Sequence, residues 1–416
     1  MMRKLKSVFS KSKPSKKSET KINFIAIPKA PTDHEILDQT TIDFAVGVLR
    51  QIGFNGNESS CLSPISLSQA LALVYSGASG DTRKEFEAVF AKGKINADTL
   101  NTLFQQTMEQ LVSTNEDLVL EIANRAYADK SLNVKTEYKE LIAKYFNGDF
   151  EQLDFSQVDS TVKEINEFVA KMTHNKFRNA VESSMINDQT RLIIVNAVYF
   201  KGNWDDPFEE ELTTDEKFYV SAGKSHKVSC ATRSPPPIAV QVKMMKRHSF
   251  FIRYTENEDV KVLSLPYVNG DARFLVYLPK EKFGLEDWVN KIDGGELLKL
   301  KGQLQTKEVE IKLPRFTVNF EIEMNNVLKK LGLLNAFTEL ADFSGITDDP
   351  LFISESIHKA LIEVNEQGTV ASAYSGRACG CAGGTPPPKK IFYADHPFLY
   401  AIFYESHPLF IGTFFG

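Results

Sequence analysis

A stretch of 25 small and weakly structured residues is the feature that most constrains how this chain can fold. It reads "VNEQGTVASAYSGRACGCAGGTPPP" from Val364 to Pro388 and holds five glycines and three prolines. It separates the apolar run 360–362 from two of the most hydrophobic segments of the chain. Connections longer than about 12–15 residues without structure of their own are uncommon, and they are usually functional or disordered. Any fold predicted for this chain therefore has to explain why such a long segment is present.

The composition is that of an ordinary globular protein, with 416 residues, 42% hydrophobic and 25% charged. The net charge of −5 hides an asymmetry, because residues 1–21 carry +7 and the remainder carries −12. We interpret residues 1–22 as a disordered basic tail, with a nuclear-localisation or anion-binding patch as the alternative. The average charge favours neither a nucleic-acid partner nor a membrane.

Cysteine usage and the N-terminal residues predict the compartment. The basic start has no apolar core of 7–15 residues as a signal peptide would, and no run approaches the 18 or so apolar residues of a membrane helix. The four cysteines (Cys61, Cys230, Cys379 and Cys381) are too few for a disulfide framework at this length. We expect a cytoplasmic protein, with the nucleus as the alternative and secretion less favoured.

Helical patterns dominate the first half of the chain. Thr82-x-x-Glu85 and Thr161-x-x-Glu164 read as capping boxes that start helices. Behind the second, an apolar helical face is predicted from Val162, Ile165, Phe168, Val169 and Met172.

Strand patterns dominate later. Residues 192–200 ("LIIVNAVYF") are almost continuously apolar, as in a strand buried on both faces, and residues 309–313 alternate. Residues 397–404 and 408–415 should pair as a hairpin around a short polar turn. Helices first and strands later predict an α+β fold, with 23–416 as one domain. The triple proline in 229–237 indicates an exposed loop.

None of the common catalytic or metal-binding motifs is present. The seven histidines lack metal-ligand spacing, and there is no nucleophile elbow or phosphate loop. Cys379-x-Cys381 is one cysteine pair without the second pair that a metal site would need. We interpret the two cysteines as free thiols, with a reversible redox lock on the loop as the alternative. We predict no metal, no cofactor and no enzymatic activity.

The long segment has two different faces when it is read as an extended strand. One face begins with four small uncharged residues and continues through an arginine, as Thr369, Ala371, Ala373, Ser375, Arg377 and Cys379. The other face carries the bulkier Val370 and Tyr374. The first half of the segment therefore has the properties of a loop that can become a central strand of a sheet.

The long segment and several other motifs of the sequence resemble those of the serpin family. Residues 363–373 ("EVNEQGTVASA") resemble the hinge of that family, and residues 190–204 ("TRLIIVNAVYFKGNW") resemble one of its most specific signatures. Further matching motifs follow in family order: "LSPISLSQALALVYSGASGDT", "ANRAYADK", "VKMMKR", "LPY", "LPRF", "LGLLNAF", "ADFSGI", "ADHPFLYAIFY" and "PLFIGTFF". The resemblance covers residues 36–416.

The resemblance implies a fold and a mechanism. The fold would have three β-sheets, eight or nine helices and an exposed reactive-centre loop at about 366–392. Inhibitory members act as suicide substrates, because a protease that cleaves the loop is held as an acyl-enzyme while the loop inserts into the main sheet. Fourteen inserted residues would span roughly 46 Å.

Individual residues can be carried over from the family motifs. A polar cluster beneath the main sheet, called the shutter, would consist of Ser63, Ser66, Asn196 and His358. Trp204 would lie at the breach, where insertion begins. The hinge would comprise Glu366, Gly368, Thr369, Ala371 and Ala373.

The family count from the hinge glycine places the scissile bond at Ala382–Gly383, give or take two residues. The small residue before the cut suggests an elastase-like serine protease, with a papain-like cysteine protease as the alternative. Arg377 departs from the family pattern, since it would be buried on insertion, and burying an unpaired charge costs several kcal/mol. Val370 replaces the usual acidic residue on the outward face.

We expect the protein to be monomeric and to bind a protease. Two hypotheses about its function follow. The first is a suicide inhibitor. The second is a non-inhibitory member, a binding or chaperone-like protein whose loop is cleaved as a plain substrate; Arg377 and the glycine-rich centre of the loop favour it.

Overall fold

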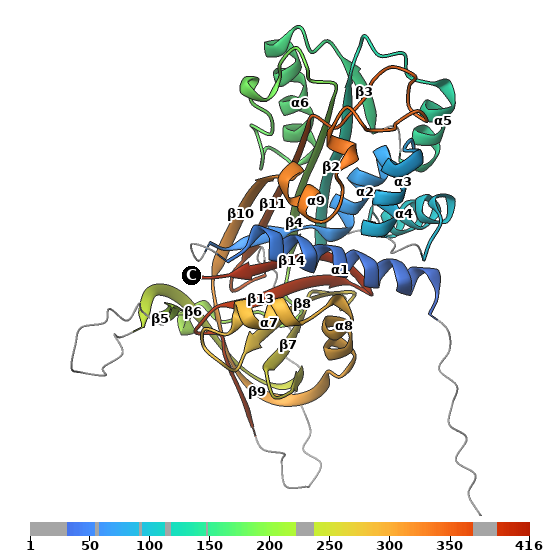
Figure 1. Cartoon of the computed structure of the whole chain (residues 1–416). Helices are drawn as coiled ribbons and strands as arrows, with labels where there is room; N and C mark the ends of the chain where they lie inside the picture. Colours follow the sequence, from blue (N-terminus) through green and yellow to red (C-terminus); the bar gives the residue numbers. More distant parts are fainter. Residues whose placement is uncertain are drawn as a thin grey trace, which may run out of the picture. The chain divides into compact units, whose positions relative to one another are not determined.

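The structure is a computed structural model that describes residues 31–54, 58–90, 94–112, 118–146, 149–221, 237–368 and 389–416 (Figure 1). Contacts within the chain separate Met1–Thr32 from one compact unit, Asp33–Gly416. The basic tail and the proline-rich stretch before Pro237 lie outside the described residues.

The described residues contain nine α-helices, six of which precede the main run of strands. They are α1 (Asp33–Ile52), α2 (Pro64–Tyr75), α3 (Gly80–Phe90), α4 (Ala97–Val112), α5 (Thr136–Tyr145), α6 (Val158–Met172), α7 (Leu285–Lys291), α8 (Gly294–Gly302) and α9 (Asn325–Lys330). Three short 3-10 helices are η1 (Ser183–Met185), η2 (Glu210–Leu212) and η3 (Asn335–Phe337). The α+β class and the number of helices agree with the prediction.

A five-stranded sheet has β4 at its centre. Its order is β10 (Phe316–Glu323), β11 (Glu355–Val364), β4 (Leu192–Gly202), β2 (Leu118–Asp129) and β3 (Phe150–Leu153). β4 and β11 pair directly and in parallel, from Glu355 opposite Ile193 to Ile362 opposite Phe200. A parallel pair has to be joined by a long crossover, and here more than 150 residues of chain separate the two strands.

The other strands form a nine-stranded network. Its order is β1 (Ser60–Leu62), β14 (His407–Phe414), β13 (Phe398–Tyr404), β8 (Ala272–Pro279), β7 (Val260–Pro266), β6 (Ile238–Glu256), β9 (Gln305–Pro314) and β12 (Lys390–Tyr393), with β5 (Thr214–Ser221) paired to β6. The predicted hairpin is present as β13 and β14.

We expected three sheets, and hydrogen bonds join the described strands into two networks. The reason is the 19-residue strand β6. Its first half pairs with β5 and its second half pairs with β7, while β9 runs alongside both halves. One strand thus connects what would otherwise be two separate sheets.

The helix α2 lies inside the fold. All of its 12 residues are buried, and it packs against β14, β2 and β4. A helix with apolar residues on every side is stable only in such a position. Pro64 occupies its first turn, where the missing N–H has no cost.

The strand β4 is buried on both faces, as its sequence predicts. Ile194, Val198 and Phe200 belong to the main core on the side of α2. Ile193 and Val195 belong to a second core, where Ile165 and Val169 of α6 are also buried. Met172, predicted for the same helical face, is exposed.

The two predicted capping boxes are wrong. α3 begins at Gly80 and α6 at Val158, so Thr82 and Thr161 lie inside their helices. The Thr82 hydroxyl instead accepts a hydrogen bond from the backbone N–H of Asp342 (2.9 Å). Among the helices that the structure describes, none combines the length and apolar character that crossing a membrane requires.

Candidate functional site at the end of strand β11

The strand β11 ends in a tight turn from which the long segment departs. Asn365 and Gly368 exchange both backbone hydrogen bonds, at 3.4 and 3.2 Å. The Asn365 side chain also accepts a hydrogen bond from the backbone N–H of Gln367 (3.1 Å). This is the hydrogen-bond pattern of a two-residue hairpin loop. The chain therefore reverses its direction here and starts back along β11.

Gly368 lies between the ends of β4 and β11. It has a φ of +95°, and a Cβ atom placed on it would come within 2.4 Å of the Gly202 carbonyl oxygen and the Trp204 nitrogen. Contacts shorter than 3.0 Å with backbone atoms cannot be relieved by a side-chain rotation. Only glycine fits this left-handed, closely packed position. The turn therefore places one residue of the departing segment in the position of a strand between β4 and β11.

Trp204 holds this turn from the side of β4. Its indole Nε1 donates a hydrogen bond to the Asn365 carbonyl oxygen (2.8 Å), and its backbone N–H donates to Gln367 O (3.1 Å). The buried indole ring stacks on Tyr267, with centroids 4.5 Å apart and planes 13° apart. Such stacking adds about 0.5–1.5 kcal/mol to the burial of the rings.

Glu366, inside the turn, is buried but has polar partners. One carboxylate oxygen accepts from the Thr213 hydroxyl (2.9 Å), and the other lies 3.7 Å from the Arg315 guanidinium. Its backbone oxygen accepts from the Phe208 N–H (2.8 Å). These contacts compensate the desolvation of the carboxylate and fix the direction in which the chain leaves β11.

A second group of polar side chains crosses the middle of the five-stranded sheet. Asn124 of β2 is opposite Asn196 of β4, and Asn196 is opposite His358 of β11. Residues in register share a face of the sheet, and this row meets Ser63 and Ser66 at the start of α2. All five residues are buried.

The hydrogen bonds of this row form one continuous chain. The backbone N–H of Ser63 donates to His358 Nε2 (3.3 Å), so Nδ1 carries the proton that is shared with the side-chain oxygen of Asn196. The Asn196 amide then donates to Ser66 Oγ (2.6 Å) and to the side-chain oxygen of Asn124. Asn124 donates in turn to Gln69 Oε1 (3.0 Å). The chain links β11 to β4 and β2 through side chains, across the seam where β4 and β11 meet.

The outer face of the same seam is crossed by the segment after α6. Its Lys176 pairs with Glu363 of β11 (3.1 Å), and the Asn179 carbonyl oxygen accepts from Lys359 of β11. His174 pairs with Glu121 of β2, on the other side of β4. This segment is therefore bound to strands on both sides of the β4–β11 seam.

Comparison with known proteins assigns the chain to a family. The family model described as serpin (serine protease inhibitor) matches residues 39–416. This chain belongs to the serpin family. It is 32% identical over 390 residues to Serpin B6 of Pongo abelii, covering 91% of this chain and 99% of that protein. It is 29% identical to Serine protease inhibitor 42Dd of Drosophila melanogaster, covering 83% and 88%.

Solved serpin structures share the fold. A crystal structure of maspin superimposes with a TM-score of 0.81 at 26% identity, covering 92% of this chain and 99% of maspin. The serpin fold implied by the sequence motifs is therefore confirmed.

The structure brings some of the predicted residues of this serpin together. Ser63, Ser66, Asn196 and His358 form one hydrogen-bonded group, and Trp204 contacts the turn that contains Glu366 and Gly368. The remaining hinge residues (Thr369, Ala371 and Ala373), the bond Ala382–Gly383, Arg377, Val370 and three of the four cysteines lie outside the described residues. The fourth, Cys61, has a free and buried thiol.

Two members of the polar row were missed in the sequence, namely Asn124 and Gln69. Asn124 lies between Ile122 and Ala126 on one face of β2, and a polar amide on such an apolar face signals a buried hydrogen-bond network. Gln69 lies in the all-buried helix α2. Each could have been found by asking which polar residues interrupt a segment that is otherwise apolar.

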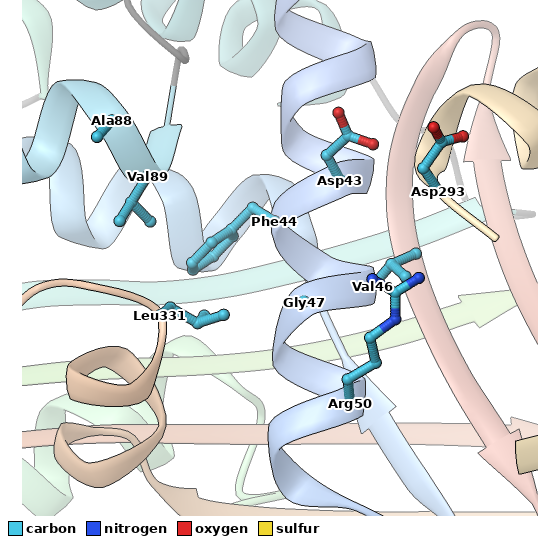
Figure 2. A pocket seen from close by; sticks show the side chains of 9 residues that line it. All are labelled: Asp43, Phe44, Val46, Gly47, Arg50, Ala88, Val89, Asp293 and Leu331. Carbon is cyan, nitrogen blue, oxygen red and sulfur yellow. The ribbon is translucent and has the colours of Figure 1, made fainter. Parts of the chain in front are cut away.

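A pocket of this serpin lies away from the turn, between α1, α3, α8 and α9 (Figure 2). It measures about 220 Å³, with apolar walls that include Phe44, Val89 and Leu331. Its polar residues cap helix ends, since Asp43 accepts from the Gly294 N–H (2.8 Å) and Arg50 donates to the Val289 carbonyl oxygen (3.0 Å). The charged residues of this pocket therefore serve the packing of the helices, through hydrogen bonds to backbone groups at helix ends.

Burial of His358 makes the stability of the protein pH-dependent. Burial lowers the pKa of His358 to about 3, against about 6.5 in an unfolded chain. The unfolded state therefore binds a proton that the folded state rejects as the pH falls below about 6.5. Between pH 6.5 and 4, we expect this residue alone to reduce the folding equilibrium constant by up to tenfold per pH unit.

The test is the slope of the unfolding free energy against pH in denaturant titrations. His358→Gln should show a slope smaller by about one proton over this range, even if it is less stable at every pH. Equal slopes in the two proteins would contradict a neutral, proton-rejecting His358.

Proposed function

We propose that this serpin is a suicide inhibitor of a protease. The nucleophile of the protease attacks the Ala382 carbonyl carbon, the bond to the Gly383 nitrogen breaks, and Ala382 stays attached to the protease as an acyl-enzyme. The cleaved segment then enters the five-stranded sheet between β4 and β11. Fourteen residues, 369–382, would carry the bound protease roughly 46 Å before water can release it.

The observation that carries this proposal is the position of the turn at residues 365–368. The turn already reverses the chain, and Gly368 already lies between the end of β11 and residues 202–204. The next residues therefore need only to continue along β11 as the parallel β4–β11 pairing opens. The segment would then hydrogen-bond antiparallel to both neighbours, which adds one full strand to the sheet.

The polar row supports the same step. Hydrogen-bonded side chains can break and remake their bonds when β4 and β11 separate, because their partners lie at the fixed start of α2. Interlocked apolar side chains at the same positions would have to give up close packing instead. The row therefore keeps the seam closed while leaving it able to open.

A non-inhibitory serpin is the second candidate function. Arg377 would lie on the inward face of the inserted strand, where an unpaired charge costs several kcal/mol. Slow insertion would let the protease complete hydrolysis, and the loop would then act as a plain substrate.

One experiment separates the two functions. The protein is incubated with pancreatic elastase and, separately, with papain, because a small residue precedes the proposed cut. An inhibitor forms a complex that survives denaturing electrophoresis, releases a peptide beginning at Gly383, and melts at a higher temperature after cleavage. Clean cleavage by both proteases, with no complex and no rise in the melting temperature, would show that the suicide mechanism is wrong.

We also propose the setting in which the protein acts. A fully buried free thiol at Cys61 fits a reducing compartment, as cysteine usage in the sequence suggests. We propose a monomer with a serine or cysteine protease as its partner.

A further inference from the structure

Two adjacent aromatic rings are exposed where β6 changes its partner strands. Phe250 and Phe251 are 62% and 67% exposed, more than any other phenylalanine in the described part of the chain. A bulge causes this exposure, because Ser249 is opposite Val309 while Ile252 is opposite Lys307. A bulge relaxes the strict alternation of a strand and redirects its side chains.

The rings are part of a larger apolar surface. The Phe250 ring lies against that of His248, with centroids 4.6 Å apart. Both His248 of β6 and Ile391 of β12 are opposite Glu310 of β9, so they share one face of the sheet. Ile391 is 49% exposed. We call His248, Phe250, Phe251 and Ile391 the aromatic patch.

Two carboxylates of β9 lie within or beside the aromatic patch, and each has a basic partner. His248 Nε2 lies 2.9 Å from Glu308 Oε1, and Lys389 pairs with Glu310. Glu310 lies between His248 and Ile391 in register, and its pairing with Lys389 compensates its charge there. A partner would therefore meet exposed aromatic and aliphatic side chains with paired polar groups among them, as protein-binding surfaces present.

Both ends of the long segment lie beside these strands. Arg247 of β6 directly precedes His248 of the aromatic patch. Its guanidinium lies over the Phe208 ring, and the Phe208 N–H donates a hydrogen bond to the Glu366 carbonyl oxygen in the turn where the long segment departs. The segment returns to the sheet at Lys389, directly before β12. The aromatic patch is thus within a few residues of each anchor.

Chain length brings a bound protease to this surface. Six residues lie between Ala382 and Lys389. The seven Cα-to-Cα steps from Lys389 to Ala382 span at most about 24 Å when the chain is fully extended. A globular protease of about 200–250 residues is roughly 40–45 Å across. A protease bound at Ala382–Gly383 therefore overhangs the strands around Lys389.

We propose that the aromatic patch is a second docking surface for the target protease, which it contacts while the loop occupies the active site. This inference rests on the proposed inhibitory function. The patch would strengthen the first, reversible complex, since exposed aromatic side chains contribute strongly when an interface covers them. The aromatic patch would not affect the later step, in which loop insertion competes with hydrolysis of the acyl-enzyme.

The test uses pancreatic elastase whose catalytic serine is replaced by alanine, so that binding stays reversible. Hydroxyl-radical footprinting should show Phe250 and Phe251 protected in the complex. The double variant Phe250→Ser/Phe251→Ser should bind about tenfold more weakly. With active elastase, it should form the covalent complex about tenfold more slowly, at an unchanged number of inhibitor molecules consumed per protease.

Leu340→Ser is the matched control, because Leu340 is 78% exposed and lies on none of these strands. Its affinity and rate should equal those of the unchanged protein. If the inactive elastase binds and the two phenylalanines stay unprotected, or if the double variant binds within twofold of the unchanged protein, the docking surface is wrong and the inhibitor proposal stands. If neither elastase nor papain is bound or trapped, the proposed function fails and the docking surface fails with it.

Discussion

Under the proposed suicide mechanism, Gly368→Ala is expected to turn this serpin from an inhibitor into a substrate. The added Cβ would meet backbone atoms of residues 202–204 at about 2.4 Å, and the φ of +95° is strained for any residue with a side chain. The strained φ costs about 1–2 kcal/mol and the overpacking about 1–3 kcal/mol more. The same contact would hinder the first step of insertion, so hydrolysis would overtake trapping. We expect at least tenfold more inhibitor to be consumed per protease inactivated.

Gly302→Ala is the control for this substitution. Gly302 has no neighbouring atom within 4 Å of an added Cβ, and its φ lies outside the left-handed range. The measurement is titration of a fixed amount of protease, together with the thermal midpoint of each variant. A Gly368→Ala protein that traps protease as efficiently as the Gly302→Ala protein would show that close packing of the turn plays no part in insertion.

Asn196→Ala is expected to destabilise the protein by about 3–5 kcal/mol. The alanine removes the acceptor for His358 Nδ1 and the donor for Ser66 Oγ and Asn124, and it leaves a small cavity between β4 and α2. The unpaired imidazole N–H contributes most, because no water reaches it. The thermal midpoint should fall by roughly 5 °C or more.

Asn319→Ala is the corresponding control on β10, at an exposed position in the same sheet. It should shift the midpoint by about 1 °C at most, since exposed substitutions have small effects. Thermal unfolding followed by circular dichroism measures both variants. If the two alanine variants melt at the same temperature, the hydrogen-bonded row contributes nothing to holding the sheet together.

Much of the fold could be predicted from apolar patterns. Residues 192–200 are buried on both faces because a central strand has no wet side, and residues 309–313 keep the alternation that their sequence shows. The C-terminal hairpin also followed from its two apolar runs. His407, predicted to lie in the polar turn, instead starts β14 and is buried against Asp38 of α1 (2.8 Å).

Other features depended on contacts that a local pattern cannot reveal. Glu85, read as part of a capping box, accepts hydrogen bonds from the backbone N–H groups of Leu334 and Asn335, about 250 residues away. The fusion of two sheets depends on the length of β6. This length was not anticipated, because the first half of β6 directly follows the proline-rich stretch that we interpreted as an exposed loop. Tertiary partners decided both cases.

The candidate site was predictable to a different degree. Family motifs indicated Ser63, Ser66, Asn196 and His358 as a group, but Asn124 had to be found from the register of β2 against β4. The tight turn at Asn365–Gly368 was not foreseen either. Its glycine signals a special backbone conformation, yet only the approach of residues 202–204 explains why no other residue fits.

The place of β14 has a consequence for biogenesis. This last strand of the chain lies between β1 and β13, and its Thr413 bonds to Ser60, 353 residues earlier. Every strand of the five-stranded sheet is synthesised before residue 365, whereas the C-terminal end of the long segment is tethered only once β12 to β14 have been made and docked. Until then the segment is held at one end only. Under the proposed mechanism, the rate at which the final hairpin docks therefore sets how many newly made molecules complete their fold before their own loop enters the sheet.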